Sequence, residues 1–241
     1  MIHLTIDDRQ IQVAPGYTLL QAARENNIPI PTLCSHEALL PYGACRLCLV
    51  ELVGSAGSKL VASCTYPCQE GLVVRTNSDL VVSTRRTVVE LLMATGMHLP
   101  IVRALAAELD IAAPYVSLQP NDCILCGLCV RACRDIVGVG AISLTHRGME
   151  REVSTPFEIS SVDCIECGTC ALVCPTGAIR VEDVTRPRRT SHAWGSAYER
   201  RACHLCECDP PGAPFPEDYQ ELLGVSEVAG NRTRIDADKR G

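Results

Sequence analysis

Aromatic residues and positive charge are both scarce in this chain of 241 residues. Phe, Trp and Tyr make up 4% of it, and 22 basic residues face 28 acidic ones, for a net charge of −6. This balance argues against a nucleic-acid partner. Long apolar runs are lacking as well. The stretch 87–109 is interrupted by Glu90, Arg103 and Glu108, so we expect no membrane span there.

Signals for export and for nucleotide binding are also missing. Residues 1–8 have neither the basic region nor the apolar core of a signal peptide, so we expect a cytoplasmic protein with reduced cysteines. The chain contains no G-x-G-x-x-G motif and no phosphate-binding loop motif, and it offers no defensible nucleophile–base pair. We therefore expect a non-catalytic chain whose chemistry comes from its cysteines.

Cysteine is abundant, with 16 residues. Two runs, 123–133 and 164–174, have the spacing C-x2-C-x2-C-x3-C, and the second run continues with Pro175, as in bacterial ferredoxins. This spacing predicts two adjacent [4Fe–4S] clusters, and hence electron transfer. Zinc is the alternative, but zinc sites favour separated C-x2-C pairs, so four-cysteine runs favour iron–sulfur clusters.

The ligands are expected to be exchanged between the two runs. A tight turn places the first three cysteines of a run on one cluster, and the fourth, near the start of a short helix, reaches the neighbouring cluster. One [4Fe–4S] cluster is thus assigned to Cys123, Cys126, Cys129 and Cys174. The other is assigned to Cys133, Cys164, Cys167 and Cys170.

The first third of the chain alternates apolar and polar residues, which predicts half-buried strands. A helix is expected to begin after the capping residue Thr18 and to be ended by Pro29 and Pro31. The expected strands are 2–6, 10–13, 49–53, 59–62 and 72–76. Four cysteines in C-x10-C-x2-C-x15-C spacing accompany them: Cys34, Cys45, Cys48 and Cys64. This order, with one long cysteine loop, is typical of a β-grasp domain that holds a [2Fe–2S] cluster.

The sequence of this region resembles a known family. The segments that carry the resemblance are 18–24, 30–34, 43–51 and 70–74. Plant-type ferredoxins have a shorter first gap, C-x4-C. The longer gap is similar to that of the diaphorase small subunit of NAD-reducing hydrogenases and of the N-terminal part of the complex I large iron–sulfur subunit. With the two later runs included, the resemblance covers about residues 1–185.

The resemblance implies an electron-transfer subunit of a larger oxidoreductase. The implied partners are a flavin-containing NAD(P)-binding subunit, a thioredoxin-like [2Fe–2S] subunit and a catalytic subunit. That last subunit would be a hydrogenase, a formate dehydrogenase or an electron-bifurcating enzyme. A free-standing polyferredoxin that diffuses between enzymes is the alternative. The iron–sulfur subunit of a succinate dehydrogenase-like enzyme is a weaker one, because its first cysteine gap is short.

One family feature is expected to be missing. Relatives usually carry a further [4Fe–4S] cluster on the pattern H-x3-C-x2-C-x5-C. Here His98 is followed by Val102, Leu105 and Ile111 at the three cysteine positions, so thiolate ligation is impossible. We expect a structural role for His98 and an amphipathic helix over 99–109. Electrons would then take another route, or the [2Fe–2S] domain would swing as a shuttle.

The C-terminal tail suggests one more metal site. Cys203, Cys206 and Cys208 follow a basic, proline-containing linker, and His192 is the best candidate for a fourth ligand. Either a third [4Fe–4S] cluster or zinc would fit a Cys3His set. Cys68 or a residue of a partner could replace His192, although Cys68 is better interpreted as a small buried apolar residue. The end of the chain is expected to form an extended arm.

The expected fold class is α+β, with ferredoxin-like domains in tandem. The expected organisation is a β-grasp [2Fe–2S] domain at 1–78, a helical connector without His/Cys3 ligands at 79–117, a bacterial-type double [4Fe–4S] domain at 118–185, and a linker with a cysteine-containing extension at 186–241.

Overall fold

The computed structural model describes residues 1–54, 57–155, 164–165 and 167–180. They form two compact units. The first unit comprises Met1–Ser35 and Pro41–Cys126, and the second comprises His36–Leu40 and the chain from Gly127 onward. None of the helices in the described part is both long and apolar enough to cross a membrane.

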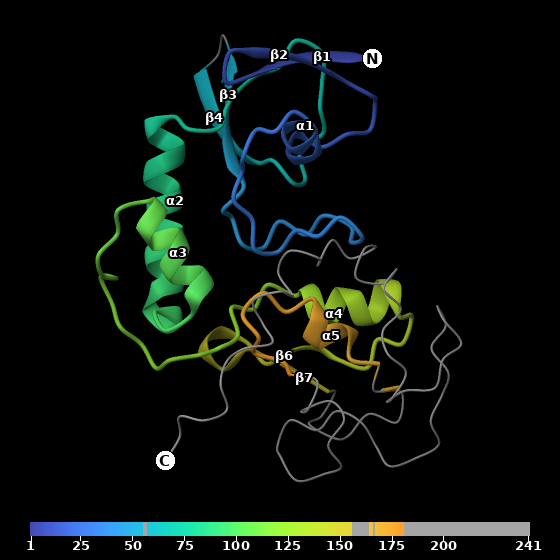
Figure 1. Cartoon of the computed structure of the whole chain (residues 1–241), viewed down its shortest axis with the longest axis vertical. Coiled ribbons are helices and arrows are strands. Elements are labelled where there is room, and N and C mark those ends of the chain that lie inside the picture. The colour runs from blue at the N-terminus through green and yellow to red at the C-terminus, as the bar shows by residue number, and fades with distance from the viewer. Residues whose placement is uncertain (55–56, 156–163, 166, 181–241) are drawn as a thin grey trace. The chain divides into compact units, whose positions relative to one another are not determined.

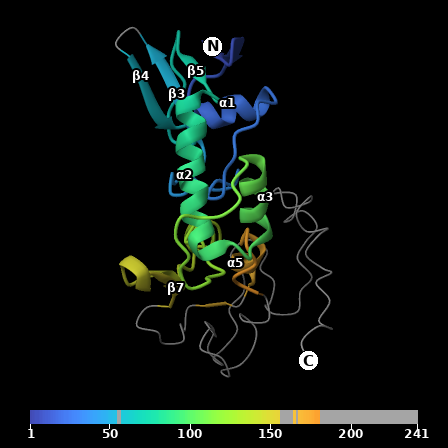
Figure 2. The same ribbon diagram turned by 90° about the vertical axis from the view of Figure 1, so that its left-hand side faces the viewer.

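The first unit contains a five-stranded mixed sheet. Four of its strands, β1 to β4, are labelled in Figure 1, and β5 is labelled in Figure 2. The order of the sheet is β2-β1-β5-β3-β4, with β1 and β5 parallel and the other neighbours antiparallel. The turn between β1 and β2 places Asp7 and Asp8 at positive φ, which matches the right-handed twist of a tight hairpin. The strands are β1 (Ile2–Ile6), β2 (Arg9–Val13), β3 (Leu49–Gly54), β4 (Gly57–Ala62) and β5 (Val73–Arg75).

Helix α1 (Leu19–Glu25) packs on this sheet. Its N-terminus carries the expected cap: Thr18 accepts from the Gln21 amide, and the Gln21 side chain accepts from the Thr18 amide. The helix ends earlier than expected. Asn26 caps its C-terminus before Pro29 is reached, so the prolines do not end it. Apolar residues of α1 and of the sheet share one core, in which Leu19, Ala22, Ile6, Val50 and Val74 are buried.

Helices α2 (Asp79–Gly96) and α3 (Pro100–Glu108) lie side by side (Figures 1 and 2). The expected amphipathic helix is therefore confirmed. Val102, which occupies one of the family's cysteine positions, is fully buried, and Leu105 and Ile111 join the same apolar cluster. His98 instead contacts Asp122, with 2.7 Å between Nε2 and Oδ1. The three positions at which the resemblance implies cysteines thus belong to an apolar cluster.

The second unit is built of short elements. A short hairpin of β6 (Ser143–Thr145) and β7 (Glu152–Ser154) is antiparallel. The unit also contains α4 (Leu128–Arg131), the π-helical turn η1 (Ala132–Ile136), the 3₁₀ turn η2 (Gly148–Glu150) and α5 (Thr169–Leu172), and α4, η1 and α5 contact one another. The helices and sheets of the part described are compatible with the expected α+β class. The predicted tail site, His192 with Cys203, Cys206 and Cys208, lies outside the described residues.

Candidate iron–sulfur sites

The β3–β4 hairpin brings Cys48 and Cys64 together. Leu49 and Ala62 pair across the hairpin, and the ladder continues one step further, since the Ser63 amide donates to the Cys48 carbonyl at 3.0 Å. Both cysteines therefore leave the same end of the hairpin. Their sulfurs are 3.4 Å apart.

The long loop before β3 supplies the other two sulfurs. The Leu33 amide donates to the Cys45 sulfur, and the Cys45 amide donates to the Cys34 sulfur, both at 3.4 Å. Amide donors of this kind stabilise thiolate, the form that binds iron. Cys34 and Cys48 are 1% exposed and Cys64 is 3% exposed, so water has little access to these sulfurs.

The four thiols form two hydrogen-bonded pairs that differ in acidity. The hydrogen bond shared with Cys34 lowers the pKa of Cys45 to about 5, and the one shared with Cys64 lowers the pKa of Cys48 to about 6. The same bonds raise the pKa of Cys34 and of Cys64. In each pair the shared hydrogen bond therefore favours the thiolate form of one sulfur, that of Cys45 or of Cys48.

The donor set fits a [2Fe–2S] cluster. Two thiolates on one tetrahedral metal lie about 3.8 Å apart when each bond is about 2.3 Å. The 3.4 Å separation of Cys48 and Cys64 is close to that value. Cys34 and Cys45 are the second pair, so each pair could hold one iron of a four-cysteine site.

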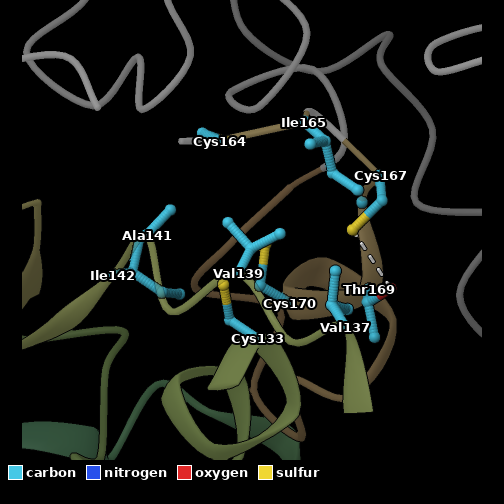
Figure 3. Close-up of a pocket in the computed structure, with 11 residues that line it drawn as sticks. Cys133, Val137, Val139, Ala141, Ile142, Cys164, Ile165, Cys167, Thr169 and Cys170 are labelled. Carbon is cyan, nitrogen blue, oxygen red and sulfur yellow. Dashed lines mark hydrogen bonds between the residues drawn. The ribbon is translucent and has the colours of Figure 1, made fainter. Parts of the chain in front are cut away.

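In the second unit, four predicted ligands from both runs surround one cavity (Figure 3). Cys133 comes from η1, Cys170 from α5, and Cys164 and Cys167 from the segment before α5. The rest of the lining is almost entirely apolar: Val137, Val139, Ala141, Ile142 and Ile165, with Gly168 and Thr169. Cysteines in an apolar wall fit an iron–sulfur cluster, whose surroundings control its access to solvent.

A glycine with positive φ precedes each of the short helices α4 and α5. Gly127 precedes α4 with φ of 71°, and Gly168 precedes α5 with φ of 74°. This left-handed conformation costs other residues about 1–2 kcal/mol. It turns the chain so that Cys129 and Cys170 enter equivalent helices. The two runs are thus structural repeats.

Cys170 lies near sulfurs that are assigned to both predicted [4Fe–4S] clusters. Burial is the main cause that raises the pKa of Cys170, and the neighbouring sulfurs of Cys167, Cys129, Cys164 and Cys133 raise it further. Cys129, which is assigned to the other cluster, is therefore close to this cavity. Neighbouring ligand sets are the arrangement that two clusters exchanging electrons require.

The ligand set predicted for the other [4Fe–4S] cluster is divided between the two units. Cys123 and Cys126 belong to the first unit, whereas Cys129 and Cys174 belong to the second. Cys126, Cys129 and Cys174 are buried. That these four share one cluster stays a prediction.

The described residues contain no group of three or more His, Cys, Asp or Glu side chains that could hold a single metal ion. A cluster spreads its ligands over several irons, so its site is wider.

Two polar residues near the sites did not emerge from the sequence. The hydroxyl oxygen of Thr169 lies 3.3 Å from the Cys167 sulfur. The only local sequence feature that indicates a role for Thr169 is its position between Gly168 and Cys170. Arg85 bonds to the backbone on both sides of Cys48 from 36 and 38 positions away, and no sequence pattern indicates such a contact. Cys68 is buried in the apolar core of the first unit, where burial raises its pKa, as expected for a core residue.

Comparisons with known proteins identify both domains. Residues 1–79 match the 2Fe-2S iron-sulfur cluster binding domain, and residues 122–178 match the 4Fe-4S dicluster domain. The chain is therefore an iron–sulfur protein with a [2Fe–2S] domain followed by a [4Fe–4S] domain.

Relatives and a solved structure extend the likeness beyond single domains. A subunit of the NADH-quinone oxidoreductase of Rhizobium meliloti (strain 1021) is 34% identical over 86% of this chain and 27% of its own length. The NADP-reducing hydrogenase subunit HndD of Solidesulfovibrio fructosivorans is 33% identical over 74% of this chain and 36% of its own. A chain of an NAD+-reducing [NiFe]-hydrogenase in the H2-reduced state is 34% identical with a TM-score of 0.56, over 64% of this chain and 74% of that one.

The chain belongs to the family of iron–sulfur electron-transfer subunits that includes the diaphorase small subunit of NAD-reducing hydrogenases and the N-terminal part of the complex I large iron–sulfur subunit. It spans only about a quarter to a third of the curated relatives, 27% and 36% of the two described above.

Proposed function

We propose that this chain carries single electrons between a flavin-containing NAD(P)-binding subunit and a catalytic subunit. The observation that carries the proposal is the cavity of the second unit, where Cys133 from one run joins Cys164, Cys167 and Cys170 from the other. An exchange of ligands between runs is typical of paired [4Fe–4S] clusters in ferredoxins. Paired clusters serve electron transfer.

The residues of the chain hold, shield and tune the redox centres. Iron–sulfur clusters, when bound, accept and release electrons one at a time. Cys34, Cys45, Cys48 and Cys64 would hold a [2Fe–2S] cluster. The two cubane sets are Cys123, Cys126, Cys129 and Cys174, and Cys133, Cys164, Cys167 and Cys170. Apolar side chains such as Val137 and Ile165 keep water from the second set, because both are buried at that cavity.

Membership of a complex is favoured over a diffusible polyferredoxin. The relatives named above are subunits of NADH- or NADP-linked oxidoreductases. By analogy, this chain would contact a flavin-containing NAD(P)-binding subunit, a thioredoxin-like [2Fe–2S] subunit and a catalytic subunit in the cytoplasm. That catalytic subunit would be a hydrogenase, a formate dehydrogenase or an electron-bifurcating enzyme.

Anaerobic native purification with mass spectrometry of the co-purifying chains tests this proposal. We expect a stable complex with a flavin-containing and a catalytic subunit. In that complex Cys126→Ser should remove one cubane signal and stop NAD(P)-linked turnover. Cys68→Ser is the control, since Cys68 lies in the core and not at a predicted cluster site.

Two results would contradict the proposal. Full turnover in the Cys126→Ser complex would show that electrons do not pass through this chain. A monomer that carries its clusters and reduces several unrelated enzymes would instead establish the diffusible polyferredoxin.

A further inference from the structure

Arg85 donates hydrogen bonds to the backbone on both sides of Cys48, a predicted cluster ligand. It is 6% exposed and comes from α2. Its Nε donates to the Leu47 carbonyl at 3.0 Å, and its Nη2 donates to the Leu49 carbonyl at 2.8 Å. The residue between these two carbonyls is Cys48. The planar guanidinium thus fixes the backbone from which the Cys48 sulfur projects.

The same side chain brings a buried positive charge to this site. An arginine stays protonated in proteins, and burial weakens the screening of its charge by water. Burial lowers the pKa of Arg85, whereas the nearby Cys48 sulfur and the Asp7 carboxylate favour its charged form. Arg85 is therefore attracted electrostatically to a cysteine that would carry iron.

Its neighbour in sequence shows what a purely structural arginine does here. Arg86 also donates to two backbone carbonyls, those of Leu109 and Asp110, and so fastens α2 to the end of α3. Neither carbonyl adjoins a predicted cluster ligand. The two arginines are alike in chemistry and differ in where they bind.

We propose that Arg85 is a positioning residue that raises the reduction potential of the [2Fe–2S] cluster by holding Cys48 and by placing a buried cation beside it. Reduction adds negative charge to a cluster, and a fixed cation nearby stabilises that form. This inference rests on the proposed function, because it takes Cys34, Cys45, Cys48 and Cys64 as the ligands of that cluster.

The test is a redox titration of the full chain, purified anaerobically with its clusters, followed by electron paramagnetic resonance. In Arg85→Gln we expect the [2Fe–2S] potential to shift to more negative values while the [4Fe–4S] potentials stay unchanged. Arg86→Gln is the matched control and should leave the [2Fe–2S] potential unchanged. Arg85→Lys keeps the charge but cannot donate to both carbonyls in the geometry of a guanidinium. We therefore expect a smaller shift of the [2Fe–2S] potential than in Arg85→Gln, together with an altered [2Fe–2S] spectrum.

The outcomes separate the two proposals. A [2Fe–2S] potential and spectrum in Arg85→Gln that equal those of the wild type would overturn the role of Arg85. No [2Fe–2S] signal in the wild type would instead overturn the cluster assignment itself. If Arg85→Gln does not fold, as seen by circular dichroism, Arg85→Lys decides. An unchanged spectrum and potential in Arg85→Lys would then overturn the proposal.

Discussion

Cys48 and Cys68 show that the surroundings of a cysteine, more than its burial, define its role. Both are almost fully buried. Cys68 lies among apolar residues of the main core, and burial raises its pKa. Cys48 lies beside another thiol and near a buried arginine, and the hydrogen bond shared with Cys64 lowers its pKa to about 6. Cys48 therefore lies where its thiolate, the ligand form, is favoured and where another predicted ligand is at hand, whereas Cys68 is packed in an apolar core.

Double variants test the exchange of ligands at the level of single residues. If Cys133 and Cys167 serve the same cluster, then Cys133→Ser combined with Cys167→Ser should lose no more iron per chain than the stronger single variant. Cys133→Ser combined with Cys126→Ser should lose iron from both cubanes. This follows because effects within one site are not additive, whereas those at independent sites are. Iron analysis of the purified chains measures it.

The opposite pattern would show that each run holds its own cluster. In that case the pair within the first run, Cys126 and Cys133, would be the non-additive one. Cys68→Ser serves again as the control and should keep the full iron content.

At the level of elements, α2 and α3 are held together by a shared apolar core. Val102, Leu105 and Ile111 stand where the family pattern has cysteines, and all three pack with α2 residues such as Val89 and Met93. Leu33 and Leu47 join the same apolar cluster. This packing therefore also supports the loops that carry Cys34 and Cys48. That the His/Cys3 cluster is missing, and that the [2Fe–2S] domain swings as a shuttle, both stay predictions.

Val102→Ala measures what this packing contributes. Val102 is fully buried, so we expect the free energy of unfolding to fall by about 1–3 kcal/mol through lost apolar contact and a residual cavity. Leu91→Ala on α2 is the control, because Leu91 is 70% exposed and should change that energy by less than about 0.5 kcal/mol. Chemical denaturation of the metal-loaded chain compares the two. Equal effects would mean that α3 does not stabilise this unit.

At the level of the whole molecule, charge is buried only sparingly in the described part. The fully charged side chains buried there are Glu51, Arg85 and Arg131. Arg85 is beside Cys48, and Arg131 is in α4 between Cys129 and Cys133, where it donates to the Leu40 carbonyl at 2.7 Å. A buried charge is costly unless it is paired. Two backbone carbonyls and the Cys48 sulfur compensate Arg85, and the Leu40 carbonyl accepts from Arg131.

The metal content of the full chain tests the predicted tail site. One [2Fe–2S] and two [4Fe–4S] clusters give about ten iron atoms per chain, and a third cubane gives about fourteen. We expect that changing Cys203, Cys206 and Cys208 together to Ser lowers the metal content by four iron atoms or by one zinc atom. Elemental analysis of both chains distinguishes these results. An unchanged metal content would show that the tail binds no metal.

The sequence by itself determined the features that depend on neighbouring residues. Cysteine spacing predicted two kinds of iron–sulfur domain, and the matches to both domains confirm them. Alternation of apolar residues predicted the strands, and Thr18 predicted the start of α1. These features involve a few consecutive positions, and local steric and hydrogen-bonding preferences act over that range. The end of α1 was placed wrongly, because Asn26 caps the helix before the prolines.

Tertiary structure alone decided which distant residues meet. It placed Arg85 of α2 against the backbone on both sides of Cys48. The approach of Cys133 to Cys164, Cys167 and Cys170, in contrast, had been predicted from their spacing. Tertiary structure also put Val102 into an apolar core. Such contacts depend on how whole elements pack, and the gain from burying apolar surface has no fixed distance along the chain. The cluster ligands could therefore be predicted from cysteine spacing. Arg85, which we infer raises the [2Fe–2S] reduction potential, could be found only from the fold.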